Sequence, residues 1–134
     1  MKKQAGSLDT NVLLRLLLND IPAQHQAALR LLETGNSFRV ADTAFIEIVF
    51  ILERNYQFNR LQITEAVEGL SGLTALLCNR VLLENALAIF ETHPSLSFED
   101  CCLVSYARLD QSEPLWTFDK KLAAQAINAR LLLA

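Results

Sequence analysis

The sequence contains little glycine, proline or cysteine. Its 134 residues include only 4 Gly, 3 Pro and 3 Cys, while 51% of all residues are hydrophobic. Glycine and proline break regular structure, so their scarcity favours helices and strands. The high apolar content argues against disorder and favours a compact helix-rich or α/β domain. A chain of this length can bury a substantial core but is too short for two domains. We therefore expect residues 1–134 to form a single domain.

The cysteines and histidines lack the spacing of a cross-linked or zinc-bound protein. Cys78, Cys101 and Cys102 form no CxxC pair and leave an odd one over, so they indicate neither a disulfide framework nor a zinc site. We expect Cys101 and Cys102 to be small packing residues and the protein to reside in a reducing cytoplasm. His25 and His93 have no partner at metal-binding spacing, and each is expected at the surface or at a helix end.

Long apolar runs and a strong positive charge are also missing. No stretch approaches the roughly 20 apolar residues that span a bilayer, and Asp9, Asn11 and Arg15 interrupt the first apolar run, which does not suit a signal peptide. We expect a soluble protein that is not exported. The formal net charge of -3 is not that of a domain held to nucleic acid by general electrostatics. A small local basic rim is still compatible with the sequence, from Arg15, Arg108, Lys120 and Lys121.

Apolar runs and turn signals alternate along the chain and predict alternating helices and strands. Strands are predicted within KKQAGSL, over 38–41, over 80–83 and over 115–117, and the terminal ARLLLA is predicted as an edge strand. In the first of these, Ala5 and Leu8 are the few apolar contacts. Helices are predicted in VLLRLLL after Asp9, in HQAALRLLETG after Pro22, and over 44–53, 86–92, 98–109 and 120–126. Thr43 is expected to cap the helix over 44–53. Residues 60–77 are expected to form either one weakened helix or two shorter ones. Such alternation implies βαβ units and a mostly parallel sheet that is covered on both faces.

Four acidic residues lie where apolar segments meet helix signals: Asp9, Glu47, Asp100 and Asp119. Residues just after a strand, or in the first turn of the next helix, point into the crevice beyond the carboxyl ends of a parallel sheet. Converging carboxylates repel one another unless a cation lies among them, and a divalent metal is the simplest such cation. The neighbours of Glu47 are apolar, so an unpartnered carboxylate buried there would be costly. The four acids therefore indicate a metal-dependent hydrolase.

The motifs around these acids resemble a known family. The order of LDTNVLLRLLL, TAFIEIVFIL, SFEDCCLVSYA and WTFDKKLA is similar to that of a PIN domain, and in particular to the VapC-type toxin ribonucleases of bacterial toxin-antitoxin pairs. The resemblance covers nearly the whole chain, and DTN and TFD are its most specific parts. It implies a three-layer α/β/α PIN-like domain whose central, mostly parallel sheet has four or five short strands. It also implies cleavage of RNA that depends on Mg²⁺ or Mn²⁺.

The resemblance assigns roles to individual residues. Asp9, Asp100 and Asp119 would coordinate the metal, and Glu47 would be a further ligand or would position a water. The polar residues of the same motifs would hold the carboxylates or contact phosphate, namely Thr10, Asn11 and Thr117. Mg²⁺ needs only a few carboxylates because it keeps several waters, and such a site can activate water for attack on a phosphodiester.

The resemblance also implies partners, and other interpretations remain open. An antitoxin would inhibit the enzyme by filling the acidic groove, and a homodimer could use the apolar stretches 48–52 and 70–77. A housekeeping nuclease, or a scaffold that binds RNA or protein without cutting, is the alternative. A phosphatase of the haloacid-dehalogenase type is disfavoured, because it would need DxD where this chain has DTN. Taken singly, Asp9 or Asp119 would be a helix cap, and Trp116 a core residue rather than a stacking platform.

Overall fold

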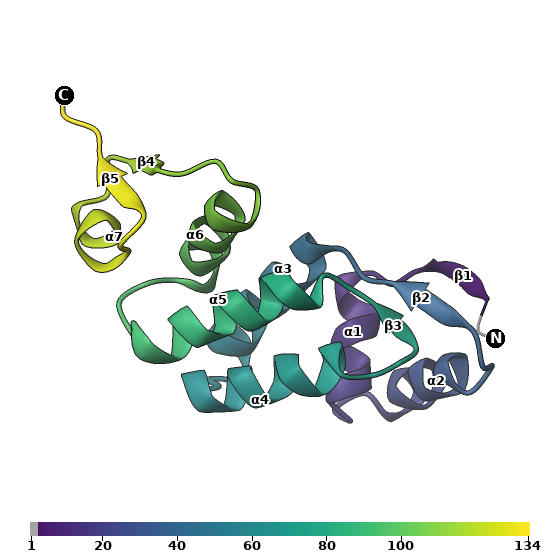
Figure 1. The fold of residues 1–134 in the computed structure, drawn as a ribbon. Helices are drawn as coiled ribbons and strands as arrows, with labels where there is room; N and C mark the ends of the chain where they lie inside the picture. Colours follow the sequence, from purple (N-terminus) through teal and green to yellow (C-terminus); the bar gives the residue numbers. More distant parts are fainter. Residues whose placement is uncertain (1–2) are drawn as a thin grey trace. The chain divides into compact units, whose positions relative to one another are not determined.

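The computed structural model describes residues 3–134, which fold into alternating helices and strands (Figure 1). The chain divides into two compact units, Met1–Asn79 and Arg80–Ala134, here called the N-terminal and C-terminal units. The N-terminal unit contains β1 (Gln4–Ser7), α1 (Thr10–Leu17), α2 (Pro22–Leu32), β2 (Ser37–Arg39), α3 (Asp42–Asn55), α4 (Arg60–Ser71) and β3 (Leu76–Leu77). The C-terminal unit contains α5 (Arg80–Thr92), α6 (Phe98–Leu109), β4 (Leu115–Thr117), α7 (Lys120–Gln125) and β5 (Ala129–Leu131).

The N-terminal unit is built on a three-stranded parallel sheet of order β1-β2-β3. The first strand is short, and its four residues are exposed, whereas Leu8 directly after it is buried. Its pairing with β2 shifts register between Gln4 and Ser7, and Gly6 in between has φ +130, a conformation that glycine adopts without strain. The predicted weak first strand therefore exists, with Leu8 rather than Ala5 as its anchor in the core.

The helices of this unit have clear boundaries. Pro22 is the first residue of α2, where its fixed φ and missing N–H suit a helix start, and Gly35 after the helix takes φ +81. The helix α4 begins with a reciprocal capping box between Asn59 and Gln62 and ends at Gly72. Residues 76–77 are consequently a strand rather than the end of a long helix.

The C-terminal unit combines a helical pair with a second parallel sheet. Helices α5 and α6 pack on each other, and the rings of Phe90 and Phe98 meet edge to face with centroids 5.5 Å apart. The sheet is formed by β4 and β5, which pair in parallel, and α7 packs against both. The predicted terminal edge strand and the strand 115–117 are thus both present.

The predicted α/β class with parallel strands is confirmed, and most elements lie where they were expected. The strand predicted over 80–83 is wrong, because these residues form the first turn of α5. Leu82, Leu83, Ala86 and Phe90 are all buried, which is the stripe of a helix, and a short apolar run alone does not separate that from a strand. Thr43 is not the cap of α3 either, since the helix begins one residue earlier, after Ala41.

The fold bears on the expectations for membrane spans, for the cysteines and for a dimer interface. No helix within residues 3–134 is long and apolar enough to cross a membrane. Cys101 and Cys102 are fully buried, as expected for packing residues. In the apolar stretches 48–52 and 70–77, which were expected to serve a core as well as a dimer interface, Ile48, Leu52 and Leu76 belong to the core of the N-terminal unit.

Candidate functional site

Asp9 is placed by the end of β1 and the start of α1. It is the N-cap of that helix, and its Oδ1 accepts a hydrogen bond from the Val12 backbone N–H at 3.0 Å. The cap satisfies one of the amides left unpaired at a helix start, and the positive end of the helix dipole favours the carboxylate. Asp9 is exposed, and the cap engages only one of its two oxygens. The side chain is therefore oriented by the backbone while it still presents an oxygen to solvent.

Asp119 repeats this arrangement at the end of β4. Its Oδ1 caps α7 by accepting from the backbone N–H groups of Lys121 at 2.9 Å and Leu122 at 3.2 Å. Thr117, the last residue of the strand, accepts a hydrogen bond at Oγ1 from the Asp119 N–H at 2.9 Å. The two motif residues are thus linked, because the threonine holds the backbone that carries the acid.

Asp100 lies in the first turn of α6 and belongs to a capping box with Ser97. The Ser97 hydroxyl accepts from the Asp100 N–H at 3.1 Å, and Asp100 Oδ2 accepts from the Ser97 N–H at 3.3 Å. The carboxylate is partly buried. As with Asp9 and Asp119, one oxygen serves the helix start and the other is not used by it.

Glu47 does not have the environment that its apolar neighbours predicted. It lies in the second turn of α3 and is exposed. Phe45, Ile48 and Val49 are buried at 0%, 0% and 1% exposure, whereas Phe50 is 57% exposed, so the helix turns Glu47 away from the core. The expectation that Glu47 is a buried carboxylate in need of a partner is wrong, because its side chain is exposed. Its motif position remains the reason to consider Glu47.

The four acids are divided equally between the two units. Asp9 and Glu47 belong to the N-terminal unit, and Asp100 and Asp119 to the C-terminal unit. Within the described part of either unit, no three His, Cys, Asp or Glu side chains form a group that could hold a metal.

The chemistry of the donors nevertheless fits a hard divalent cation. All four candidates are carboxylates, and Asp9, Asp100 and Asp119 each keep one oxygen outside the helix cap. Mg²⁺ and Mn²⁺ prefer such oxygen ligands and retain waters. The two histidines instead hydrogen-bond the backbone. His25 Nδ1 lies 2.7 Å from the Arg15 carbonyl oxygen, and His93 Nδ1 lies 3.1 Å from the Ile89 carbonyl oxygen.

A pocket lies beside Asp9 between α1 and α2. Its volume is about 420 Å³, and its walls are mainly apolar. The lining side chains come from one face of each helix and are Asp9, Asn11, Val12, Arg15, Gln24, Ala27, Ala28 and Leu31. The predicted motif residue Asn11 thus shares a hollow with the candidate ligand Asp9, and Thr10 begins the same helix.

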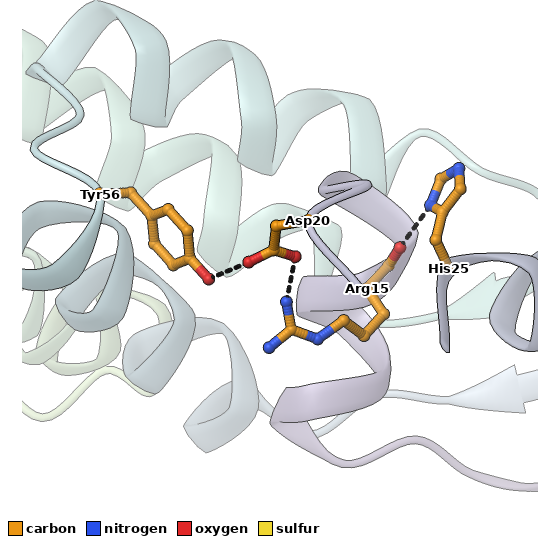
Figure 2. A network of polar contacts seen from close by, with 4 residues as sticks. All are labelled: Arg15, Asp20, His25 and Tyr56. Atoms are coloured by element: carbon orange, nitrogen blue, oxygen red, sulfur yellow. Dashed lines mark hydrogen bonds and ion pairs between the residues drawn. The ribbon is translucent and has the colours of Figure 1, made fainter. Parts of the chain in front are cut away.

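A polar network holds Arg15 in the wall of this pocket (Figure 2). Asp20, in the turn between α1 and α2, pairs with the Arg15 guanidinium through Oδ1, and its Oδ2 accepts from the Tyr56 hydroxyl at 2.6 Å. The Tyr56 hydroxyl and the Arg15 guanidinium together lower the pKa of the Asp20 carboxyl. His25 bonds the Arg15 carbonyl oxygen. The Arg15 side chain is only 13% exposed, so this cation is held in place beside Asp9.

Sequence reasoning identified Arg15 only as one basic residue among several and missed its partners. Tyr56 lies 36 residues from Asp20, and no local pattern connects the two. The expectation for Trp116 is also wrong, since its side chain is 54% exposed rather than part of the core. Five acids outside the motifs are all exposed, namely Glu53, Glu65, Glu68, Asp110 and Glu113.

Comparison with known proteins identifies the family. The sequence profile described as PIN domain matches residues 7–128. The chain belongs to the PIN-domain family. No curated protein sequence matches it. The matched range contains all four acids and runs through both units.

Membership of the PIN-domain family indicates a general type of activity. PIN domains are typically nucleases that depend on divalent metal ions, so the general interpretation as a metal-dependent hydrolase agrees with the family. The predicted fold class is that of this family as well.

Proposed function

We propose that this PIN-domain protein is an endoribonuclease dependent on Mg²⁺ or Mn²⁺, which acts in the cytoplasm as the toxin of a toxin-antitoxin pair. The observation that carries the proposal is the placement of Asp9, Asp100 and Asp119. Asp9 and Asp119 are the N-caps of their helices and Asp100 lies in the first turn of α6, and each uses only one carboxylate oxygen at the helix start. Asn or Ser would cap a helix about as well as Asp does, so the cap alone does not require a carboxylate at Asp9 or Asp119.

In this proposal the four acids hold the metal, with Glu47 as a further ligand or as the residue that positions water. When bound, the ion would lower the pKa of a water and stabilise the leaving oxygen of the phosphodiester. The protein contributes orientation. Caps fix Asp9 and Asp119, Thr117 holds the backbone at Asp119, and Asn11 and Thr10 border the same region.

Arg15 supplies the positive charge that phosphate contact requires. It lines the pocket with Asp9 and Asn11, and its pairing with Asp20 restrains its guanidinium. Arginine recognises phosphate oxygens through planar, paired donors. We assign to Arg15 the positioning of the RNA backbone next to Asp9.

The antitoxin belongs to the same proposal. A segment of this partner would fill the pocket beside Asp9, whose mainly apolar walls and volume of about 420 Å³ suit protein side chains. A homodimer is also proposed. Because the core uses most apolar residues of 48–52 and 70–77, its contacts would have to come from exposed apolar side chains outside the core.

The central experiment compares two substitutions of one acid. Asp119→Asn keeps a good N-cap but removes the charge, whereas Asp119→Ala removes both. We expect Asp119→Asn to reduce metal-dependent cleavage of a structured RNA by at least about 100-fold, with an unchanged unfolding midpoint. Asp119→Ala should lose the same activity and, in addition, about 1 kcal/mol of stability.

The matched control is Asp110→Asn, because Asp110 is an exposed carboxylate at the other end of a helix. This variant should cleave as the wild type does. Induction in a bacterial host tests the toxin role with the same proteins: wild type and Asp110→Asn should arrest growth, and Asp119→Asn should not. Equal RNA cleavage by wild type and Asp119→Asn would contradict the site assignment. Cleavage without growth arrest would favour a housekeeping nuclease, and binding without cleavage a scaffold.

A further inference from the structure

The C-terminal unit exposes an aromatic surface next to Asp119. Trp116, the only tryptophan of the chain, lies in the middle of β4 and is 54% exposed, and Phe118 directly after the strand is 67% exposed. Both rings lie within three residues of the candidate metal ligand. Large aromatic side chains are normally buried in a core or an interface, so their exposure here calls for a ligand.

The sheet positions this surface firmly. In the parallel register Trp116 lies opposite Arg130 of β5, whose guanidinium carbon is 5.6 Å from the centre of the indole ring. Backbone pairing continues past the strand, because the Leu132 N–H donates to the Thr117 carbonyl at 2.7 Å. The neighbours Leu115 and Thr117 are less exposed, and α6 and α7 pack against the sheet. The aromatic surface is therefore held on a supported strand.

Positive charges accompany these rings. Arg130 lies against Trp116, and Lys120 and Lys121 follow Asp119 and are exposed. Exposed aromatic rings with cations nearby match the chemistry of single-stranded nucleic acid, since bases stack on the rings and phosphates meet the cations. A purely apolar protein partner would gain nothing from these positive charges.

A hollow extends the surface toward the amino ends of the two strands. It has a volume of about 380 Å³ and is lined by Glu113, Pro114, Ile127, Asn128, Ala129 and Arg130. Glu113 there is paired with Arg108 at 3.8 Å, so its charge is partly balanced. From this hollow the chain passes through Trp116 in β4, then Phe118 directly after the strand, and then Asp119, so it leads from the hollow to the proposed metal ligand.

We propose that Trp116 and Phe118, together with Arg130, form a stacking surface that holds two unpaired bases of single-stranded RNA beside Asp119. The identity of the ligand as substrate rests on the proposed ribonuclease function. Stacking requires bases that are free of a duplex, so this surface selects single-stranded loops and tails as cleavage sites. It gives the nuclease a preference for unpaired RNA without reading a specific sequence.

The test uses the fluorescence of Trp116 as a built-in probe. An unlabelled single-stranded oligoribonucleotide of mixed sequence is added to the protein of residues 1–134 in EDTA, so that binding is observed without cleavage. We expect saturable quenching by the single strand and little quenching by a duplex of the same sequence. Equal quenching by the duplex, or no quenching by either, would overturn the proposal.

Substitutions assign the binding to named residues, with a fluorescently labelled oligoribonucleotide as the reporter. Trp116→Ala should weaken binding about 5- to 100-fold, the range of one lost base-aromatic stack. Trp116→Phe keeps an aromatic face and should retain most of the affinity, which also guards against an Ala variant that fails to fold. Arg130→Gln should weaken binding about 3- to 10-fold and reduce its dependence on salt. Unchanged affinity in Trp116→Ala and Arg130→Gln would refute the assignment.

The chain offers a matched control. Phe50 on α3 is 57% exposed and also lies under an arginine, with Arg54 at 5.0 Å from its ring. Phe50→Ala should bind RNA within about twofold of wild type if the surface at β4 is specific. If Trp116 instead contacts a second copy of the chain, its emission will change with protein concentration in the absence of RNA, and the proposal fails. Quenching without cleavage in Mg²⁺ or Mn²⁺ would refute the nuclease function but leave the RNA surface standing.

Discussion

Three of the four candidate metal ligands also stabilise the start of a helix. Asp9, Asp100 and Asp119 all accept backbone hydrogen bonds at helix starts. The positions of Asp9 and Asp119 were predictable, because an acid that follows an apolar strand and precedes a helical run is a recognisable cap, and Asp100 was expected at the start of its helix. The exposure of Glu47 was not predictable from its neighbours, since the phase of the helix decides which side of α3 faces the core. Cap and ligand are compatible here because each uses a different oxygen.

The Asp20 network leads to a prediction about pH. Because the Tyr56 hydroxyl and Arg15 lower the pKa of Asp20 below its usual value of 3.8, the interaction contributes to stability above that pH. Its contribution is lost as the pH falls through the lowered pKa. We therefore expect the difference in unfolding free energy between wild type and Asp20→Asn to be largest near neutral pH and to shrink in acid. Urea unfolding of both proteins from pH 7 down to about pH 3 measures this difference.

Tyr56→Phe tests whether the tyrosine contributes to the same effect. The substitution keeps the ring and removes only the hydroxyl that donates to Asp20. It should therefore reproduce part of the pH-dependent difference seen with Asp20→Asn. A difference between wild type and Asp20→Asn that stays constant from neutral to acidic pH would show that folding does not lower the pKa of Asp20.

At the scale of elements, glycine conformation provides a prediction with an internal control. Gly6 has φ +130 in the irregular part of β1, and an added Cβ there would meet no atom within 4 Å. Gly6→Ala should therefore be destabilising through backbone strain alone, by about 1 kcal/mol or more. Gly69 lies in α4, also in open space, so Gly69→Ala should stabilise by about 0.4–1 kcal/mol. Chemical unfolding of the two variants measures both signs.

The two glycine variants also test how β1 supports Asp9. If the strand fixes the start of α1, Gly6→Ala should lower RNA cleavage as well as stability, whereas Gly69→Ala should leave cleavage unchanged. A Gly6→Ala protein as stable as wild type would mean that the bulge relaxes without cost. Sequence reasoning placed a short strand here but had no means to locate a bulge, because register depends on the partner strand.

The elements that sequence reasoning misjudged share a physical cause. Residues 80–83 and 76–77 are short apolar runs of equal character, and one begins α5 while the other forms β3. The apolar stripe that continues through Phe90 makes the first a helix, and pairing with β2 makes the second a strand. Both decisions depend on contacts beyond the run itself, so composition within a window of four residues cannot make them.

At the scale of the whole molecule, the order of motifs was more informative than any single element. DTN and TFD, with the two helical acids between them, predicted the family that the profile match over residues 7–128 confirms. The surface near Asp119 was not predictable in the same way. A tryptophan in a three-residue strand has no signature that separates a core position from an exposed one, because that depends on which face the helices cover.

Metal binding provides the prediction that involves the entire chain. The proposed ligands come from both units, and in the described part of neither unit do three such side chains gather. An ion that binds only the folded arrangement stabilises it by mass action, by about 2.7 kcal/mol when its concentration is 100 times the Kd. We expect Mg²⁺ or Mn²⁺ to raise the unfolding free energy of the wild type, and EDTA to reverse the effect.

Substitutions in either unit should abolish this stabilisation. Asp9→Asn and Asp119→Asn both keep their caps, so any loss of the metal response reports on ligation and not on local folding. Each should lose most of the stabilisation although the two acids belong to different units, and Asp110→Asn should respond as the wild type does. Thermal or urea unfolding with and without the ion measures the response. A full response in Asp9→Asn would remove this residue from the site, and an equal response in all variants would place the ion elsewhere on the protein.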